Sequence, residues 1–381
     1  MAARRGASAR KKTVPVDPLA LAPEEDQPSF AFAPLPASAV PTLAGATTWL
    51  REKRIGSAET TGVGGPSTDL DLENSTRFRY PGLYSGIPFP ANPSQYIQSA
   101  FLPGGSTQNA TWTFAVDFMT DANAVEFRFN APTASVALGL VFVNGKRIQE
   151  QALRSTDRTA GSGYSWTLTF PTAATRRITI YGINNIAGRF GGVAIPAGYS
   201  LWKPVEAATR RIAFIGDSYT GGAGSPPTGA GRQETYMWNL GLLMGGDELI
   251  NAGIGSTGFV TMAGGDAESV FAGRIDEVLA MNPDVVVIAG GRNDSPEGLQ
   301  AAVEQLLQSV SSVPEVYVFS TASTTDQAAA RNEIQAGCVA QNVPYIDVDI
   351  NAIEKGADGI HPTWQGHQDI ASVVYAGIAG L

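Results

Sequence analysis

One stretch decides how the C-terminal half of this chain folds: it runs RIAFIGDSYTGG from Arg211 to Gly222. It begins with an apolar, β-branched run, which is typical of a buried strand. Because the run ends at Gly216 and small or polar residues come next, we expect a sharp turn from strand to helix. Ser218 would then lie at the carboxyl end of a strand, where open α/β sheets bind ligands. A Gly-Asp-Ser triplet alone is more often a turn or a helix N-cap, so its meaning depends on the rest of the chain.

The sequence after Pro204 alternates between strand patterns and helix patterns. Apolar runs predict strands at 212–216, 248–252, 284–290, 316–320 and 345–348. Longer segments between and after them predict helices at 235–244, 273–281, 298–310, 326–341 and 366–379. This alternation is typical of a parallel sheet with crossover helices. Residues 205–381 are therefore predicted to form a three-layer, doubly wound α/β domain.

The sequence before Pro204 has a different period. Apolar and polar residues alternate from Thr111 onward, and the apolar run Val136–Val143 ends at Asn144-Gly145, a dipeptide favoured in tight hairpins. Short strands without helical periods between them predict an antiparallel β-sandwich, similar to a jelly roll, over residues 96–204.

The N-terminal region carries weaker signals. Residues 1–45 are rich in proline and are predicted to be an extended or disordered arm, and residues 46–95 an irregular linking segment with one short helix at 47–53. Basic residues up to Lys12 are not followed by an apolar core, so no signal peptide is predicted. No run of about eighteen apolar residues occurs, so we expect no membrane insertion. The expected location is cytoplasmic or virion-associated.

Composition argues against several functional classes. Hydrophobic residues make up 43% of the 381, which is enough for a real core, and the net charge of -9 argues against a nucleic-acid partner. The one cysteine, Cys338, cannot form an internal disulfide and is expected to be a small apolar residue of a helix. Two histidines and one cysteine without ligand spacing predict no metal site, and no cofactor is predicted.

Polar residues follow the ends of the predicted strands, which a parallel sheet brings to one edge. The fifth strand is followed by Asp358-Gly-Ile-His361, so a histidine lies three residues from a carboxylate. This is the pair that an activated serine needs. We predict that Ser218 attacks an acyl carbon, that His361 takes its proton and returns it to the leaving alcohol, and that Asp358 orients the imidazole. Asp217 is expected to form the turn rather than to take part in catalysis.

Charge that develops on the carbonyl oxygen needs donors that already point at it. The predicted donors are the backbone amide of Ser218, a backbone amide from the turn at Gly255 and Ser256, and the side-chain amide of Asn293. Glycines between Asn251 and Gly258 would let the backbone of this turn face the site.

At these residues the sequence resembles the SGNH hydrolases of the GDSL esterase superfamily, over about 210–381. Three blocks carry the resemblance: Gly-Asp-Ser at 216–218, Gly-Arg-Asn-Asp at 291–294 and Asp-Gly-Ile-His-Pro at 358–362. The resemblance implies that Ser218 is the nucleophile, that Asn293 is an oxyanion donor, and that Asp358 and His361 complete the triad.

The resemblance bears on two further positions. His367 follows Gly366 in the way that many relatives have a Gly-His pair at the start of the last helix, which implies a noncatalytic, structural histidine. The second block departs from the family, because Ser256 lies where relatives have the glycine whose amide completes the oxyanion hole. A backbone donor survives a change of side chain, so activity is still expected.

A β domain ahead of such a hydrolase is similar to two-domain carbohydrate esterases, which act on acetylated sugars. We therefore predict a serine esterase that removes short acyl groups, first of all acetyl, from an acylated glycan. An alternative is a structural or receptor-binding virion protein, a tail or capsid appendage with a hydrolase-like head, whose arm assembles a homo-oligomer or the virion. A third hypothesis is a cytoplasmic lipase-like or thioesterase-like hydrolase.

Overall fold

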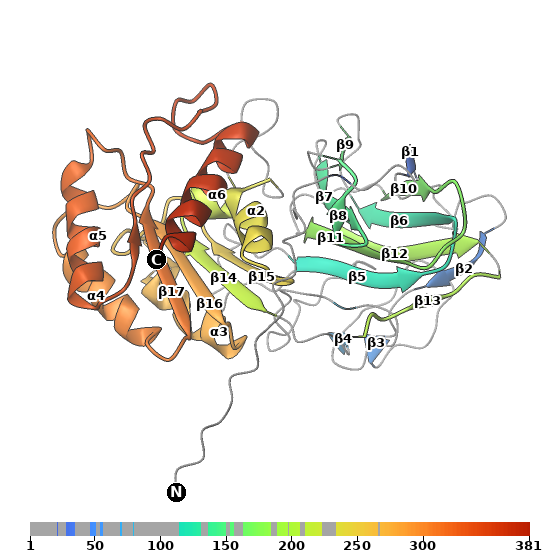
Figure 1. Ribbon diagram of the computed structural model, residues 1–381, viewed down its shortest axis with the longest axis horizontal. Coiled ribbons are helices and arrows are strands. Elements are labelled where there is room, and N and C mark those ends of the chain that lie inside the picture. Colours follow the sequence, from blue (N-terminus) through green and yellow to red (C-terminus); the bar gives the residue numbers. More distant parts are fainter. Residues whose placement is uncertain are drawn as a thin grey trace, which may run out of the picture.

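The computed structural model describes two lobes, an α/β domain and a β domain (Figure 1). The described residues are 21, 28–34, 46–50, 54–55, 69–70, 79, 114–130, 136–149, 153–155, 163–183, 189–196, 198–205, 210–222, 234–265 and 267–381. None of the helices in this described part is long and apolar enough to cross a membrane.

The α/β domain is built on a parallel sheet of five strands. Their spatial order is β15 (Glu248–Gly253), β14 (Arg211–Gly216), β16 (Val285–Gly290), β17 (Glu315–Ser320) and β18 (Tyr345–Ile346). Each strand was predicted within a few residues. The chain passes from β14 to its neighbour β15 on one edge and then to β16, the neighbour of β14 on its opposite edge. A topological switch point therefore lies between β14 and β16.

Helices cover both faces of this sheet, which confirms the predicted three-layer α/β domain (Figure 1). One face is covered by α2 (Tyr236–Leu243) and α6 (Trp364–Ala379). The other is covered by α3 (Ile275–Ala280), α4 (Leu299–Ser309) and α5 (Ala328–Ala340). The helix predicted at 273–281 begins instead with a short 3-10 turn, Ala272–Arg274, before α3.

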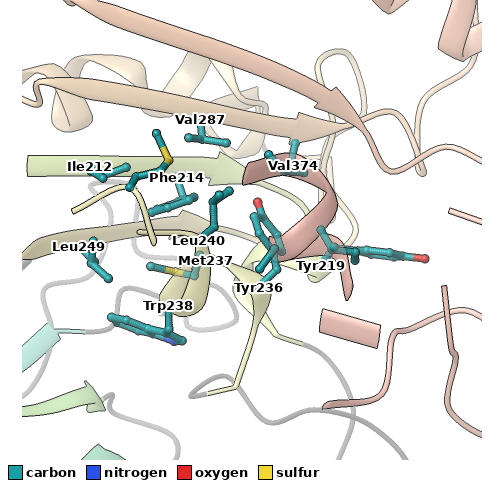
Figure 2. Close-up of a cluster of buried hydrophobic side chains, with 14 of the residues drawn as sticks. Ile212, Phe214, Tyr219, Tyr236, Met237, Trp238, Leu240, Leu249, Val287 and Val374 are labelled. Carbon is teal, nitrogen blue, oxygen red and sulfur yellow. The ribbon is translucent and has the colours of Figure 1, made fainter. Parts of the chain in front are cut away.

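The strands are apolar on both sides because both sides are covered. Phe214 and Val287 pack toward α2 and α6, whereas Ile215 and Ile288 pack toward the other helices. Figure 2 shows the first of these clusters, with side chains from the sheet and from α2 and α6 interleaved. Period-two alternation is therefore absent from these strands, and a continuous apolar run was the correct sequence signal.

The β domain consists of two antiparallel sheets. One has the order β1 (Ser29–Pro34), β10 (Gly163–Thr169), β6 (Ala124–Asn130), β12 (Arg189–Pro196) and β2 (Ala46–Leu50). The other has the order β13 (Leu201–Trp202), β5 (Phe114–Thr120), β11 (Arg176–Ile183), β7 (Val136–Val143) and β8 (Lys146–Arg147), with β9 (Leu153–Ser155) paired to β7. Phe118 and Phe127 meet between the sheets, with ring centroids 5.9 Å apart.

The hairpin predicted at Asn144-Gly145 is confirmed. Both residues have positive φ, 50° and 79°, as a tight two-residue turn requires, and they join β7 to β8.

Two segments of the N-terminal region take part in the β domain, which differs from the prediction of a separate arm and linking segment. Ser29–Pro34, placed in the arm 1–45, is a strand that pairs with β10 over six residues. The helix predicted at 47–53 is replaced by β2, which pairs with β12. Thr47 and Thr48 are β-branched and favour a strand once a sheet edge is available, and that edge lies far away in the sequence.

The rest of the predicted arm and linking segment lies largely outside the described residues. The described part includes a two-stranded sheet of β3 (Arg54–Ile55) and β4 (Asp69–Leu70).

The two domains share a buried interface. Trp238 on α2 lies against Tyr181 on β11, with ring centroids 5.6 Å apart, and Tyr181 in turn meets Phe142 edge to face. All three belong to the cluster that also fills the α2 and α6 face of the sheet. Figure 2 shows Trp238 on the side of this cluster that faces the β domain. The helix α2 therefore belongs to both cores.

A charged network crosses the same boundary. Asp117 on β5 is buried and accepts two hydrogen bonds from Arg177, at 2.9 and 2.7 Å. Arg79 forms an ion pair with Asp117 at 3.3 Å and donates to the backbone oxygen of Asp247, 3.0 Å away, in the turn before β15. Arg79 thus connects the β domain to the α/β domain.

Trp238→Ala is expected to lower the free energy of unfolding by about 3–5 kcal/mol, because it leaves a cavity in the cluster that both domains share. Urea unfolding followed by tryptophan fluorescence and circular dichroism measures the loss. Val339→Ala, at a side chain that is 74% exposed, serves as the control and is expected to change stability by less than about 0.5 kcal/mol. Equal losses in the two variants would contradict a shared core at Trp238.

Candidate active site

The predicted site residues lie at the carboxyl edge of the parallel sheet. The strands β14, β15 and β16 end in register, since Gly216 pairs with both Gly253 and Ala289. Ser218 follows β14, Gly255 follows β15 and Asn293 follows β16. The topology therefore brings these three segments together at the switch point, which is where open α/β sheets bind their ligands.

Asp217 holds the turn that presents Ser218. It is the N-cap of α1 (Ser218–Gly221), and its Oδ1 accepts a hydrogen bond from the backbone N–H of Tyr219 at 2.8 Å. Its Oδ2 accepts from the hydroxyl of Thr321 at 2.7 Å, at the end of β17. The carboxyl group is fully buried, and burial raises its pKa to about 6. The turn-forming role predicted for Asp217 agrees with these contacts.

The helix α1 lies unusually close to β15. A Cβ on Gly253 would come within 2.2 Å of the backbone nitrogen of Gly221, so only glycine allows this approach. The glycine at the end of β15 therefore sets the depth at which α1, and with it Ser218, lies against the sheet.

The predicted catalytic residues form one hydrogen-bonded chain. His361 Nε2 lies 2.9 Å from Ser218 Oγ, and His361 Nδ1 lies 2.7 Å from Asp358 Oδ2. The other oxygen of Asp358 accepts from the backbone N–H groups of Ile360 and His361. The hydrogen bond from His361, together with these backbone donors, lowers the pKa of Asp358 to about 2, so this carboxylate is charged at neutral pH.

This chain runs from the interior to the surface. Ser218 is buried, while the side chain of His361 is 22% exposed and that of Asp358 is 45% exposed. A serine beside an imidazole that a carboxylate orients is the arrangement needed to activate the hydroxyl as a nucleophile.

The predicted oxyanion donors differ in their surroundings. A Cβ on Gly255 would lie 3.8 Å from Ser218 Cβ, so the backbone of Gly255 is beside the nucleophile. Ser256 is exposed and has a φ of 62°, which is uncommon for a residue other than glycine. The side-chain amide of Asn293 donates one hydrogen bond to the backbone oxygen of Thr257, at 2.8 Å. Among the described residues nothing accepts from the second N–H of this amide, which can therefore donate to a ligand.

Sequence reasoning missed the role of Asp294. Its carboxylate accepts hydrogen bonds from three successive backbone N–H groups, those of residues 259–261, at 3.1, 3.0 and 3.1 Å. A Cβ on Gly258 would come within 2.1 Å of this carboxylate. Asp294 thus holds the loop after β15 against the loop after β16. Its position next to Asn293 in the sequence was the signal that could have indicated this role.

Sequence reasoning also missed Arg274, which is fully buried beneath the site. Its guanidinium donates to the backbone oxygen of Gly216 at 3.2 Å and to the hydroxyl of Thr257 at 3.3 Å. Burial lowers the pKa of Arg274 to about 9. It joins the turn of the nucleophile to the loop after β15, and no motif in the sequence pointed to it.

His367 does not contact the catalytic chain. It is buried in α6, its Nδ1 accepts a hydrogen bond from the backbone N–H of Tyr236 at 3.1 Å, and its ring stacks on that of Tyr236. These contacts agree with the structural role predicted for this histidine. Burial lowers its pKa to about 3, so it is neutral at physiological pH.

Within the described residues, no three His, Cys, Asp or Glu side chains come together in a way that could hold a metal ion. Cys338 lies buried in α5, and burial raises the pKa of its thiol to about 12. It belongs to the core cluster of α3, α4 and α5, as expected for a small apolar residue.

Residues 214–368 match the model of the GDSL-like Lipase/Acylhydrolase family. This part of the chain, which includes the hydrogen-bonded chain of Ser218, His361 and Asp358, is a GDSL-like lipase/acylhydrolase domain. No curated protein sequence matches the chain.

Several solved structures share the two-domain fold. The chain is similar to a carbohydrate esterase family 2 enzyme with a carbohydrate-binding domain from Corynascus thermopiles (Myceliophthora fergusii), at 15% identity and a TM-score of 0.57, over 80% of this chain and 98% of that one. An acetyl xylan esterase from the rumen bacterium Butyrivibrio proteoclasticus has 13% identity and a TM-score of 0.56, over 81% and 97%. A salicylyl-acyltransferase from a tetracycline biosynthetic pathway has 16% identity and a TM-score of 0.57, over 80% and 95%.

The pKa of His367 predicts a specific dependence of stability on pH. The folded pKa, about 3, is below the ordinary 6.5, so below pH 6.5 the unfolded chain binds a proton that the folded chain does not. Stability is therefore lost as pH falls from about 6.5 toward 3, by about 2 kcal/mol at pH 5. In His367→Asn the side-chain oxygen can accept the same hydrogen bond without titrating.

Urea unfolding of the intact protein and of His367→Asn at pH 7 and pH 5 measures this effect. We expect the intact protein to lose about 2 kcal/mol relative to the variant between these two pH values. Parallel curves for the two proteins would show that His367 does not resist protonation in the folded state.

Proposed function

We propose that this chain is a serine esterase that removes short acyl groups, first of all acetyl, from a carbohydrate. The observation that carries the proposal is the unbroken hydrogen-bonded chain from the Ser218 hydroxyl through His361 to the charged carboxylate of Asp358. It lies at the switch point of a GDSL-like lipase/acylhydrolase domain. Acyl transfer through a covalent serine intermediate is the chemistry that such a chain supports.

In the first half of the reaction, Ser218 Oγ attacks the carbonyl carbon of the ester while its proton moves to His361 Nε2. Asp358 accepts the hydrogen bond of Nδ1 and stabilises the imidazolium. The bond to the leaving alcohol then breaks, and His361 gives its proton to the alcohol oxygen. The product is an acyl ester on Ser218.

The negative charge on the carbonyl oxygen is stabilised by preorganised donors. We assign this role to the backbone amide of Ser218, to a backbone amide of the Gly255–Ser256 turn and to the second N–H of Asn293. Asn293 cannot rotate freely, because its other N–H is bound to Thr257. A donor that is fixed before the reaction needs no reorganisation when the charge develops.

Two observations support a carbohydrate substrate. The side chain of Asp358 is 45% exposed, so the triad opens toward the surface, where the acylated unit of a polymer can reach it. The arrangement of a β domain followed by a hydrolase domain is also that of structures described as carbohydrate esterases. A salicylyl-acyltransferase shares this fold, so the acyl acceptor, water or an alcohol, must be measured rather than inferred from the fold.

Labelling by a fluorophosphonate and release of acetate from acetylated xylo-oligosaccharides test this function. Intact protein is expected to do both, and Ser218→Ala neither, since the substitution removes the nucleophile. The matched control is Ser309→Ala, an exposed serine of α4 whose hydroxyl donates to the backbone oxygen of Gln305 in the same helix, and it is expected to retain both activities.

The possible results test different parts of the proposal. Intact protein that is labelled but releases no acetate would retain the activated serine and overturn the carbohydrate substrate. Transfer of acetyl to added alcohols in preference to water would favour an acyltransferase. If the intact protein is not labelled and releases no acetate, the esterase function is excluded.

Asn293→Ala is expected to lower kcat by about 10²–10³-fold with little change in KM, because the lost donor acts on the transition state more than on the bound ester. Steady-state kinetics with p-nitrophenyl acetate measure this loss. Asn332→Ala, on the exposed side of α5, provides the control and should leave kcat unchanged. An Asn293→Ala variant that raises KM alone would place this amide in substrate binding instead.

A further inference from the structure

The segment that carries Asp358 and His361 buries few of its side chains, so packing does little to fix its position. This histidine loop, residues 355–362, lies between β18 and α6, and its residues 357–360 are all exposed. Its internal hydrogen bonds centre on the exposed carboxylate of Asp358, with two further backbone bonds, one of them from the N–H of Gly356 to the oxygen of His361 at 2.9 Å. The loop therefore needs contacts outside itself to place His361 beside the nucleophile.

Tyr219, the residue after the nucleophile, supplies such a contact. Its hydroxyl donates a hydrogen bond to the backbone oxygen of Ile360 at 2.6 Å, and the centroid of its ring lies 6.2 Å from that of His361. Figure 2 shows Tyr219 at the edge of the buried cluster, with its hydroxyl pointing away from the other labelled side chains. Burial raises the pKa of Tyr219, so its hydroxyl stays protonated and remains a donor at neutral pH.

Among hydrogen bonds between described residues, two connect the histidine loop to α1. One joins Ser218 to His361, and the other joins Tyr219 to Ile360. They differ in one chemical respect. Acylation converts Ser218 Oγ into an ester oxygen without a proton, so this oxygen can no longer donate to His361. The hydrogen bond of Tyr219 involves no reacting atom and survives acylation.

We propose that Tyr219 is a positioning residue for the second half of the reaction, holding His361 in place while Ser218 is acylated. The inference rests on the proposed ester hydrolysis. In that half, a water oxygen attacks the acyl carbon while His361 Nε2 takes a proton from the water. The bond between the acyl carbon and Ser218 Oγ then breaks, the proton passes from His361 to Oγ, and a carboxylic acid leaves. His361 must be in place before the water is activated, and at that stage the Tyr219 contact is the remaining hydrogen bond between the described parts of α1 and the loop.

Tyr219→Phe removes this hydrogen bond while it keeps the buried ring. Stopped-flow measurement with p-nitrophenyl acetate gives the acylation rate from the burst of p-nitrophenol and the deacylation rate from the steady phase. We expect the acylation rate, kcat/KM and the rate of fluorophosphonate labelling to stay within about twofold of the intact protein. The deacylation rate is expected to fall by up to about tenfold, the upper end of the range for one lost hydrogen bond, and the burst to approach one p-nitrophenol per active site.

The matched control is Tyr317→Phe. The hydroxyl of Tyr317 bonds to Glu315 at the amino end of β17, away from the carboxyl edge that carries the site. Both rates are expected to stay within twofold in this variant. Thermal unfolding of all three proteins shows whether Tyr219→Phe retains the fold.

The outcomes separate this inference from the proposed function. Equal falls in acylation and deacylation in Tyr219→Phe, or no change in either, would overturn the inference alone, since the contact would then act on both steps or on neither. Intact protein that neither labels nor hydrolyses the ester would overturn the proposed function and the inference with it. A selective fall in deacylation, absent from Tyr317→Phe, is the result that supports the inference.

Discussion

The buried carboxylate of Asp217 is the interaction on which the site depends. It accepts a hydrogen bond from the backbone N–H of Tyr219 in α1 on one side and from the hydroxyl of Thr321, after β17, on the other. Such a group is costly to bury, as its raised pKa shows, and the hydrogen bonds it accepts offset part of this cost. These hydrogen bonds hold the tight turn in which the strand β14 passes into a helix within two residues. Ser218 is thereby presented at the edge of the sheet, and Tyr219 is directed toward the histidine loop.

Other buried charges connect the remaining segments to this turn. Arg274 joins the backbone of Gly216 to the loop after β15, and Asp294 joins that loop to the loop after β16. The side chain of Asn293 also contributes, through its bond to Thr257. Each loop of the site is thus tied to its neighbour by a polar or charged side chain. This is how irregular segments gain the positional accuracy that catalysis requires.

The β domain contributes to the site through α2. This helix packs against the sheet on one side and, through Trp238, against Tyr181 of the β domain on the other. It also supplies Tyr236, whose hydroxyl bonds to Thr220 in α1 and whose backbone bonds to His367 in α6. The interface between the domains is therefore continuous, through α2, with the packing around the nucleophile, so the two domains support one site.

The sequence alone was enough to predict the elements of the α/β domain, some strands of the β domain such as Val136–Val143, and Ser218, Asp358 and His361 as candidate site residues, but it did not predict β12. Those predictions rest on local quantities, the period of apolar residues and the spacing within short motifs. The other features depend on contacts that form only when distant segments of the chain come together. Ser29–Pro34 and β2 are strands because sheet edges far along the chain accept them, and short segments have no strong preference of their own. Tyr219 meets Ile360 across 141 residues, and Asp294 and Arg274 act on backbone groups that no local pattern identifies, because such contacts exist only once the sheet has brought its strand ends together.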